Sequence, residues 1–322
     1  MTRTQYFVRR ILQSVVTVFI AATITFAILR LIPGDPTMMF DGPFMPPDLR
    51  RHLLADFGLN QPLPVQYAKY LFQLAQGNFG VSFSERAPVT EVIFTALPWT
   101  LLLTGSSVLL TLVLAIPLGI LTVMHRGRVF DLLIRGVTIT TGALFIPWVS
   151  LIALNFFGLH LKWFPIGGAE TPVLNPGDSR VMDVIRHLIL PVLVLTFTSL
   201  GPYVLFLRTS LVEVMEADYV RTARAKGVVE RRVLLVHAFR NALIPLVTVI
   251  GLRLGFLVGG AVLAETVFAY PGVGRLIFRS VQQHDYPVLQ GAFLMLAITV
   301  VLFNLITDLL YGFLDPRIRY GR

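Results

Sequence analysis

The sequence predicts an all-helical membrane protein with six transmembrane helices, and three observations predict it: the composition, the apolar runs and the distribution of basic residues. Of 322 residues, 55% are hydrophobic and only 14% are charged, whereas a soluble domain carries about 25% charged residues. The mean hydropathy is +0.74. These values indicate a chain that lies in a bilayer, before any motif is considered.

Six runs are long and apolar enough to cross the hydrocarbon core of a bilayer, which is about 30 Å thick. They are Val8–Leu31, Pro98–Met124, Gly136–Leu159, Leu188–Leu207, Ala242–Phe268 and Val288–Leu310. The first run is longer than the core of a cleaved signal peptide, which holds about 7–15 apolar residues. We therefore interpret it as a retained span. An even number of spans places both termini on the same side of the membrane.

Lys and Arg residues gather in the segments that six spans would place on one side. Residues 1–10, 125–135, 208–241 and 316–322 carry 16 basic residues in 62 positions, whereas 30–91, 160–187 and 269–287 carry 10 in 109. Because cytoplasmic loops are enriched in Lys and Arg, the first set, with both termini, is predicted to be cytoplasmic. The formal net charge of +9 then reflects membrane orientation and does not indicate nucleic-acid binding.

The segment between the first two spans, residues 32–97, is too long for a simple turn. It contains two amphipathic runs, Asp48–Phe57 and Val65–Leu74, which predict short helices. We expect a small helical subdomain on the outer face. The first unit is then residues 1–31, and a membrane core over residues 98–322 follows the subdomain and includes the cytoplasmic loop 208–241.

Several kinds of chemistry are excluded by the sequence. Cysteine is absent, so there are no disulfides, zinc-thiolate sites or cysteine nucleophiles. The chain also lacks the GxxxxGK[ST], HExxH and GxSxG motifs. His160, His187 and His284 are too scattered to predict a metal site. We expect a non-catalytic chain without a cofactor or metal of its own, so uphill transport would need a partner or an ion gradient.

The most informative segment lies between the fourth and fifth predicted spans. Asp218 can cap the N-terminus of a short helix over Tyr219–Lys226. Gly227 then ends this helix, because the C-terminal turn commonly needs a left-handed residue. Ala223 and Ala225 keep the helix slim, so the backbone of another protein can approach it closely.

Glu230 starts a second helix that continues into the fifth span, so the segment is a helix–turn–helix at the cytoplasmic surface. A basic loop resting on anionic lipid headgroups is the alternative interpretation. Such a loop would need the charge but not the Ala-x-Ala-x-Gly spacing. The spacing therefore favours a protein-docking element.

The segment RTARAKGVVERRVLLVHAFRNALIP at Arg221–Pro245 resembles the cytoplasmic "EAA" loop of ABC importer permeases, in the form of the dipeptide, oligopeptide and nickel family. In that family the loop forms a coupling helix that sits in a groove of the ATPase subunit. Arg-Thr-Ala stands here where the general motif has Glu-Ala-Ala, as is usual in the peptide branch. The resemblance implies ATPase-coupling roles for Asp218, Tyr219, Arg221, Thr222, Ala223, Arg224, Ala225, Lys226 and Gly227.

Six further motifs resemble the same family, in an order that covers nearly the whole chain. They are IPGDP at 32–36, GLNQPLPVQY at 58–67, GNFGVSF at 77–83, ETVFAYPGVGRL at 265–276, DYP at 285–287 and LDPRIR at 314–319. Together they are similar to the B-type permease subunit of dipeptide systems. The resemblance implies a type I ABC importer permease fold with a periplasmic subdomain, in the bacterial inner membrane.

The resemblance also implies partners and a function. The partners are a homologous second permease, two ABC ATPase subunits that carry ATP and Mg, an extracytoplasmic substrate-binding protein and the lipid bilayer. The implied function is ATP-driven import of di- or oligopeptides by alternating access. Nickel complexes and oligosaccharides are alternative cargoes. A stand-alone ion-driven carrier or membrane enzyme is an alternative of another class, against which the docking loop and the lack of paired membrane carboxylates count.

Polar and small residues in the fifth predicted span are further candidates. Arg253 lies near its middle, where a buried Arg costs at least about 2.5 kcal/mol. It either lines the translocation pathway and attracts an anionic group, or bonds to carbonyls or an acidic residue nearby. Gly251, Gly255 and Gly259 predict close helix packing, within the subunit or against the second permease. Glu265 ends the span, and with the glycine-rich turn after it either gates the outer mouth of the pathway or forms a tight turn.

Overall fold

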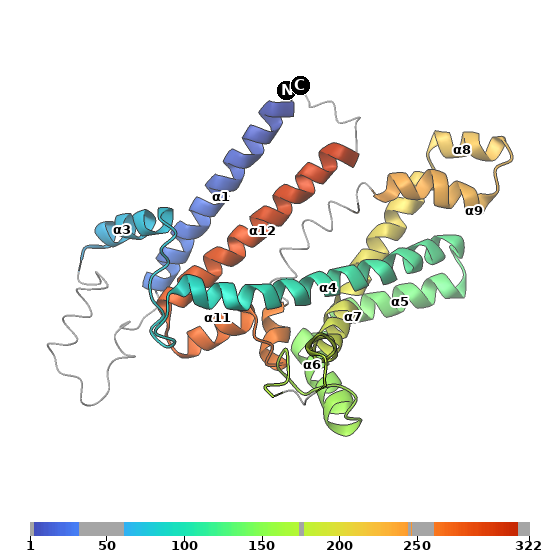
Figure 1. Cartoon of the computed structure of the whole chain (residues 1–322). Helices are drawn as coiled ribbons and strands as arrows, with labels where there is room; N and C mark the ends of the chain where they lie inside the picture. Colours follow the sequence, from blue (N-terminus) through green and yellow to red (C-terminus); the bar gives the residue numbers. More distant parts are fainter. Residues whose placement is uncertain (1–2, 32–60, 174–176, 244–245, 247–260, 315–322) are drawn as a thin grey trace.

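A computed structural model of the chain describes residues 3–31, 61–173, 177–243, 246 and 261–314. In these residues the regular secondary structure is helical, and one isolated bridge joins Val81 to Pro88. Figure 1 shows the arrangement of the helices. Their bounds are α1 Arg3–Leu31, α3 Leu63–Ala75, α4 Val89–Met124, α5 Val129–Ala143, α6 Ile146–Ala153, η2 Leu154–His160, α7 Arg180–Met215, α8 Asp218–Ala225, α9 Glu230–Arg232, η3 Val233–Ala238, α11 Val273–Gln282 and α12 Tyr286–Leu314.

Four of these helices, α1, α4, α7 and α12, each contain a run long and apolar enough to cross a membrane. They correspond to the first, second, fourth and sixth predicted spans. Most of the fifth predicted span, Ala242–Phe268, lies outside the described residues, as do Arg253 and the three glycines Gly251, Gly255 and Gly259. The motifs at 32–36 and 315–319 and the amphipathic run Asp48–Phe57 also lie outside them.

Two predicted spans are too short. Helix α4 begins at Val89 and continues through Pro98, where the predicted span began, and α7 covers Arg180–Met215 and not only Leu188–Leu207. Proline often marks a helix boundary. Each helix nevertheless contains two internal prolines, which membrane helices tolerate because neighbouring groups satisfy the freed backbone atoms.

The third predicted span, Gly136–Leu159, is not one straight helix. Helix α5 ends at Ala143, Leu144 and Phe145 are extended, and α6 begins at Ile146. The cause is Pro147, which has no N–H to donate to the carbonyl of Ala143 and whose ring would clash with it in a continuous helix. The two parts, Val129–Ala143 and Ile146–His160, meet at an angle of 98°.

Helix α7 is the central packing element, with α4 and α5 lying along it (Figure 1). Its residues Tyr203, Val204, Leu207 and Leu211 are buried in one apolar cluster. The approach of α5 to α7 is close enough to need a glycine, because a Cβ atom on Gly201 would overlap the backbone carbonyl of Thr138.

Helices α1 and α12 form an antiparallel pair in Figure 1, with the start of α1 near the end of α12. Helix α3, which coincides with the second predicted amphipathic run, packs on α1. The hydroxyl groups of Tyr67 and Thr23 are 2.7 Å apart, and Phe26 stacks on the ring of Tyr70. Part of the segment between the first two spans is therefore a helix docked on α1.

Replacing Gly201 with Ala should lower the free energy of unfolding by about 1–3 kcal/mol, because the added methyl group cannot fit against the α5 backbone. The measurement is thermal unfolding of the purified protein in detergent. Gly136→Ala on α5 is the matched control, since a Cβ there meets no neighbour within 4 Å. Equal melting temperatures of the two variants would contradict the close approach.

Candidate functional site

Helix α8 lies beyond the end of α7, at one extremity of the described structure (Figure 1). It starts one residue earlier than predicted: Ala217 occupies the N-cap position, and Asp218 is the first helical residue. The prediction that Asp218 caps the helix is therefore wrong. No side-chain cap bond is made, and the exposed carboxylate of Asp218 lies 3.8 Å from the Arg221 guanidinium. An acidic residue in the first turn still interacts favourably with the helix dipole.

The end of α8 is as predicted. Gly227 has a φ of +78°, its N–H donates to the carbonyl of Arg224 at 2.9 Å, and the N–H of Val228 donates to the carbonyl of Ala223 at 3.3 Å. These two bonds form a Schellman motif, which satisfies carbonyls at the helix end and requires a left-handed residue. A Cβ on Gly227 would meet no atom within 4 Å, so the backbone angle alone selects glycine here.

One face of α8 packs against the rest of the chain, and most of its other side chains are exposed. Val220 is completely buried, and α8 packs against η3. The hydroxyl group of Tyr219 accepts a hydrogen bond from Asn241 at 2.8 Å. Ala223 is half-buried. The exposed residues of Asp218–Gly227 are Asp218, Tyr219, Arg221, Thr222, Arg224, Ala225, Lys226 and Gly227.

Arg224 ties the two helices of the segment together. Its Nε and Nη2 atoms donate to the two carboxylate oxygens of Glu230 at 3.0 and 2.6 Å, and its Nη1 atom donates to the carbonyl of Met215 at 3.3 Å. The hydrogen bonds that Glu230 accepts from Arg224 lower the pKa of Glu230 from its usual value. Arg224 therefore joins the end of α7, α8 and the start of α9 in this chain.

The second helix begins at Glu230, as predicted, and continues through α9 and η3 to Leu243. Its buried residues Leu234 and Ala238 belong to the same apolar cluster as Leu207 and Leu211 of α7. Helix α8 is thus carried on a helical segment that is packed on a membrane-spanning helix, and the turn between α8 and α9 is closed by hydrogen bonds.

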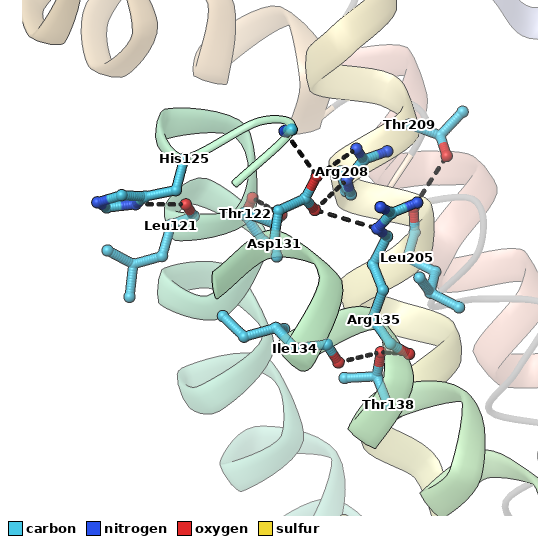
Figure 2. Close-up of polar contacts among 12 residues, drawn as sticks. Leu121, Thr122, His125, Asp131, Ile134, Arg135, Thr138, Leu205, Arg208 and Thr209 are labelled. Atoms are coloured by element: carbon cyan, nitrogen blue, oxygen red, sulfur yellow. Dashed lines mark hydrogen bonds and ion pairs between the residues drawn. The ribbon is translucent and has the colours of Figure 1, made fainter. Parts of the chain in front are cut away.

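A buried ion cluster connects α7 to α5 near the same extremity (Figure 2). The carboxylate of Asp131, 1% exposed, accepts hydrogen bonds from Nε and Nη2 of Arg208, both at 3.0 Å. The Nε atom of Arg135 lies 3.2 Å from the same carboxylate, and the N–H of Gly127 donates to it at 3.2 Å. Fork-like Arg–carboxylate pairs of this kind are strong and fix orientation.

The sequence analysis missed this cluster. Asp131 and Arg208 are far apart in the chain, and nothing in their local spacing pairs them. The sequence contained one signal for this cluster. Asp131 is an acidic residue in the first turn of an apolar helix and has basic residues nearby. A second link, between Arg126 and Glu216 at 3.4 Å, is exposed at both side chains and contributes little by itself.

Glu265 is completely buried. Its carboxylate accepts hydrogen bonds from the hydroxyl of Thr100 at 2.7 Å and from the N–H groups of Gly274 and Arg275 at 2.7 and 3.1 Å. It thereby satisfies the N-terminus of α11, whose N-cap residue, Gly272, has no side chain that could cap the helix. The carboxylate of Glu265 is thus buried and hydrogen-bonded, and its pathway role stays a prediction.

The chain is similar to known proteins in both sequence and fold. Two family models match: "Binding-protein-dependent transport system inner membrane component" over residues 115–320, and the N-terminal model of the same membrane component over residues 3–104. Among solved structures, the inward-facing MetNI methionine ABC transporter matches with a TM-score of 0.58 and 16% identity, over 70% of this chain and 97% of that chain. At this identity the match shows the fold alone.

Several relatives match over nearly their whole length. The dipeptide transport system permease protein DppB of Escherichia coli (strain K12) is 37% identical, and the oligopeptide transport system permease protein AppB of Bacillus subtilis is 40% identical. The glutathione transport system permease protein GsiC of Salmonella paratyphi A is 38% identical. Each alignment covers 98% of this chain and 99% of the relative. The chain therefore belongs to the family of binding-protein-dependent transport system inner membrane components, with the type I ABC importer permease fold.

Proposed function

We propose that this chain is the permease subunit of an ATP-driven importer of di- or oligopeptides, and that α8 is its coupling helix. The observation that carries the proposal is the geometry of α8: a short helix with an exposed polar and small-residue surface, closed by a Schellman turn and fixed to α7. Full-length similarity to permeases named for dipeptides, oligopeptides and glutathione supports a peptide cargo.

The proposed partners follow from the family. Two ATPase subunits would bind ATP and Mg and hold α8, a homologous second permease would complete the pathway, and an extracytoplasmic binding protein would deliver the substrate. Arg221, Thr222 and Ala225 are exposed on α8 and are our candidates for the ATPase contact. Arg253 and Glu265 remain candidates for the pathway, and Gly251, Gly255 and Gly259 for helix packing.

The contacts around α8 provide a route for movement. Displacement of α8 would reach the end of α7 through Arg224 and the start of the fifth predicted span through η3. From α7 it would pass to α5 through Arg208 and Asp131. These links favour movement of α5, α7 and α8 as one body, which is what alternating access by rigid-body motion requires.

We also propose that α8 and both termini lie in the cytoplasm of the bacterium. Figure 1 supports a shared side for the start of α1 and the end of α12. The basic residues of 125–135 and 208–241 support the assignment of this side, since cytoplasmic loops carry an excess of Lys and Arg. Residues 32–97 would then form the periplasmic subdomain and 98–322 the permease core.

The cargo is tested by uptake into proteoliposomes that contain the complete complex and its binding protein. Labelled di- and tripeptides should accumulate only with internal ATP, and unlabelled peptide should compete. Accumulation of a nickel complex or an oligosaccharide, unaffected by excess peptide, would assign the cargo to those alternatives. Uptake by this chain alone, driven by an ion gradient, would overturn the permease proposal.

Replacing Ala225 with Glu should reduce ATP-driven uptake at least tenfold, because the larger charged side chain would occupy the surface where the ATPase approaches. Insertion in the membrane should be unchanged, since Ala225 is exposed. Ala225→Ser is the matched control, with a small side chain at the same position, and should keep most activity. The measurements are ATPase co-purification and peptide uptake. Normal values of both for Ala225→Glu would show that α8 is not the docking helix.

Asp131→Asn should destabilise the protein by about 1.5–3 kcal/mol, because it removes the buried carboxylate that accepts two hydrogen bonds from Arg208, whose side chain is 18% exposed. The double variant Asp131→Asn/Arg208→Gln should recover part of that loss. Thermal unfolding of the single and double variants measures the coupling between the two side chains. In each of these variants that still assembles with the ATPase subunits, ATP hydrolysis should continue while peptide uptake falls. Additive effects on stability would contradict the pairing, and unchanged uptake would contradict its role in movement.

A further inference from the structure

A cavity of about 630 Å³ lies between the N-terminal half of α1 and the C-terminal half of α12. Arg9, Arg10 and Gln13 of α1 and Asn304 of α12 contribute polar lining. Leu12, Val16, Val301 and Leu305 contribute apolar lining. The cavity therefore has cationic and amide groups together with aliphatic walls, and two helices build it.

The polarity of the cavity changes along α1. Arg9 and Arg10 come at the start of the apolar span Val8–Ile28, and Val16 lies farther along the same helix. At 1.5 Å of rise per residue, Arg9 and Val16 are separated by about 10 Å along the helix axis. A cationic end followed by an aliphatic wall matches a molecule with an anionic head and an apolar tail.

We propose that this cavity binds an anionic phospholipid, with the phosphate at Arg9, added positive charge from Arg10 at the same end, and the first carbons of an acyl chain along Leu12, Val16 and Leu305. Arginine suits this role because its planar guanidinium donates two parallel hydrogen bonds to a phosphate. The amide groups of Gln13 and Asn304 can donate to the remaining headgroup or ester oxygens.

The surroundings favour a lipid over a soluble anion or a protein segment. Val8, Leu12 and Val16 of α1 are about half exposed, so the cavity adjoins a surface that hydrocarbon would cover. An Arg at the end of a membrane span lies at headgroup depth, and basic pockets between membrane helices bind anionic headgroups. By contrast, the cavity between η2 and α7, lined by Phe156, Phe157 and Phe197, has no charged lining residue.

The test uses the purified, delipidated complex in detergent, with lipid binding followed by native mass spectrometry. Phosphatidylglycerol should bind at least fivefold more tightly than phosphatidylcholine. Arg9→Gln/Arg10→Gln should remove this preference. Arg128→Gln/Arg240→Gln removes the same charge at two exposed residues outside the cavity and should keep it. Equal binding of the two lipids by the original protein, or loss of preference in both double variants, would overturn the proposal.

Three further experiments distinguish a shaped lipid site from simple charge attraction, a free-anion site and a protein interface. Ser14→Leu keeps both arginines but fills the cavity, and it should weaken phosphatidylglycerol binding at least threefold. Full binding by this variant would mean that the arginines act only as surface charge. Inorganic phosphate at millimolar concentration should not displace the lipid; displacement would indicate a free-anion site. A cross-link from Ser14→Cys to a second protein chain, in place of lipid binding, would assign the cavity to a protein interface. The proposal is independent of cargo and of the role of α8.

Discussion

The packing of other helices on α7 is the constraint on which the arrangement of the candidate site depends. Helices α4 and α5 lie along α7, and the buried residues Leu234 and Ala238 of η3 join the same apolar cluster. Gly201 allows the backbone of α5 to approach, and the Asp131–Arg208 pair fixes the rotation of the two helices about each other. Apolar contacts alone are non-directional, so a forked ion pair adds an orientation that they do not provide.

Two buried carboxylates organise the other end of the described structure in the same manner. Glu265 satisfies the N-terminus of α11 and also holds Thr100 of α4. Asp285 accepts hydrogen bonds from Ser82 at 2.7 Å and from the backbone N–H of Ser84 at 3.0 Å. Each carboxylate therefore links a helix start to a distant segment. Around Glu265, glycines make room for the carboxylate, because a Cβ on Gly272 or Gly274 would overlap it.

The membrane explains why the chain tolerates irregular helices. With no water in the hydrocarbon core, each backbone polar group must be satisfied inside the protein, which favours helices throughout. Prolines inside α4 and α7 remove single hydrogen bonds without ending either helix. Pro147 does interrupt the helical path and turns it by 98° between α5 and α6. The same residue type thus has two outcomes, and packing decides between them.

The sequence by itself determined the membrane class, the helical fold and the end of α8. The length and apolarity of a run are local properties of the chain, so they can be recognised from the sequence. The left-handed backbone conformation that selects glycine at Gly227 is also local. Family resemblance, carried by motifs in order, identified the permease family. The start of α4 at Val89 and the end of α5 at Ala143 could not be placed from the sequence, because a proline's effect depends on the contacts around it.

Only the tertiary structure decided which distant polar residues meet. Asp131 pairs with Arg208, and Glu265 bonds to Thr100, across intervals that no periodicity predicts. The tertiary structure also decided that Arg224 bonds within its own loop, so this residue stabilises the conformation of the segment. Pairing of this kind follows from how helices pack in three dimensions, and a pattern read along the chain contains the residue types but not their partners.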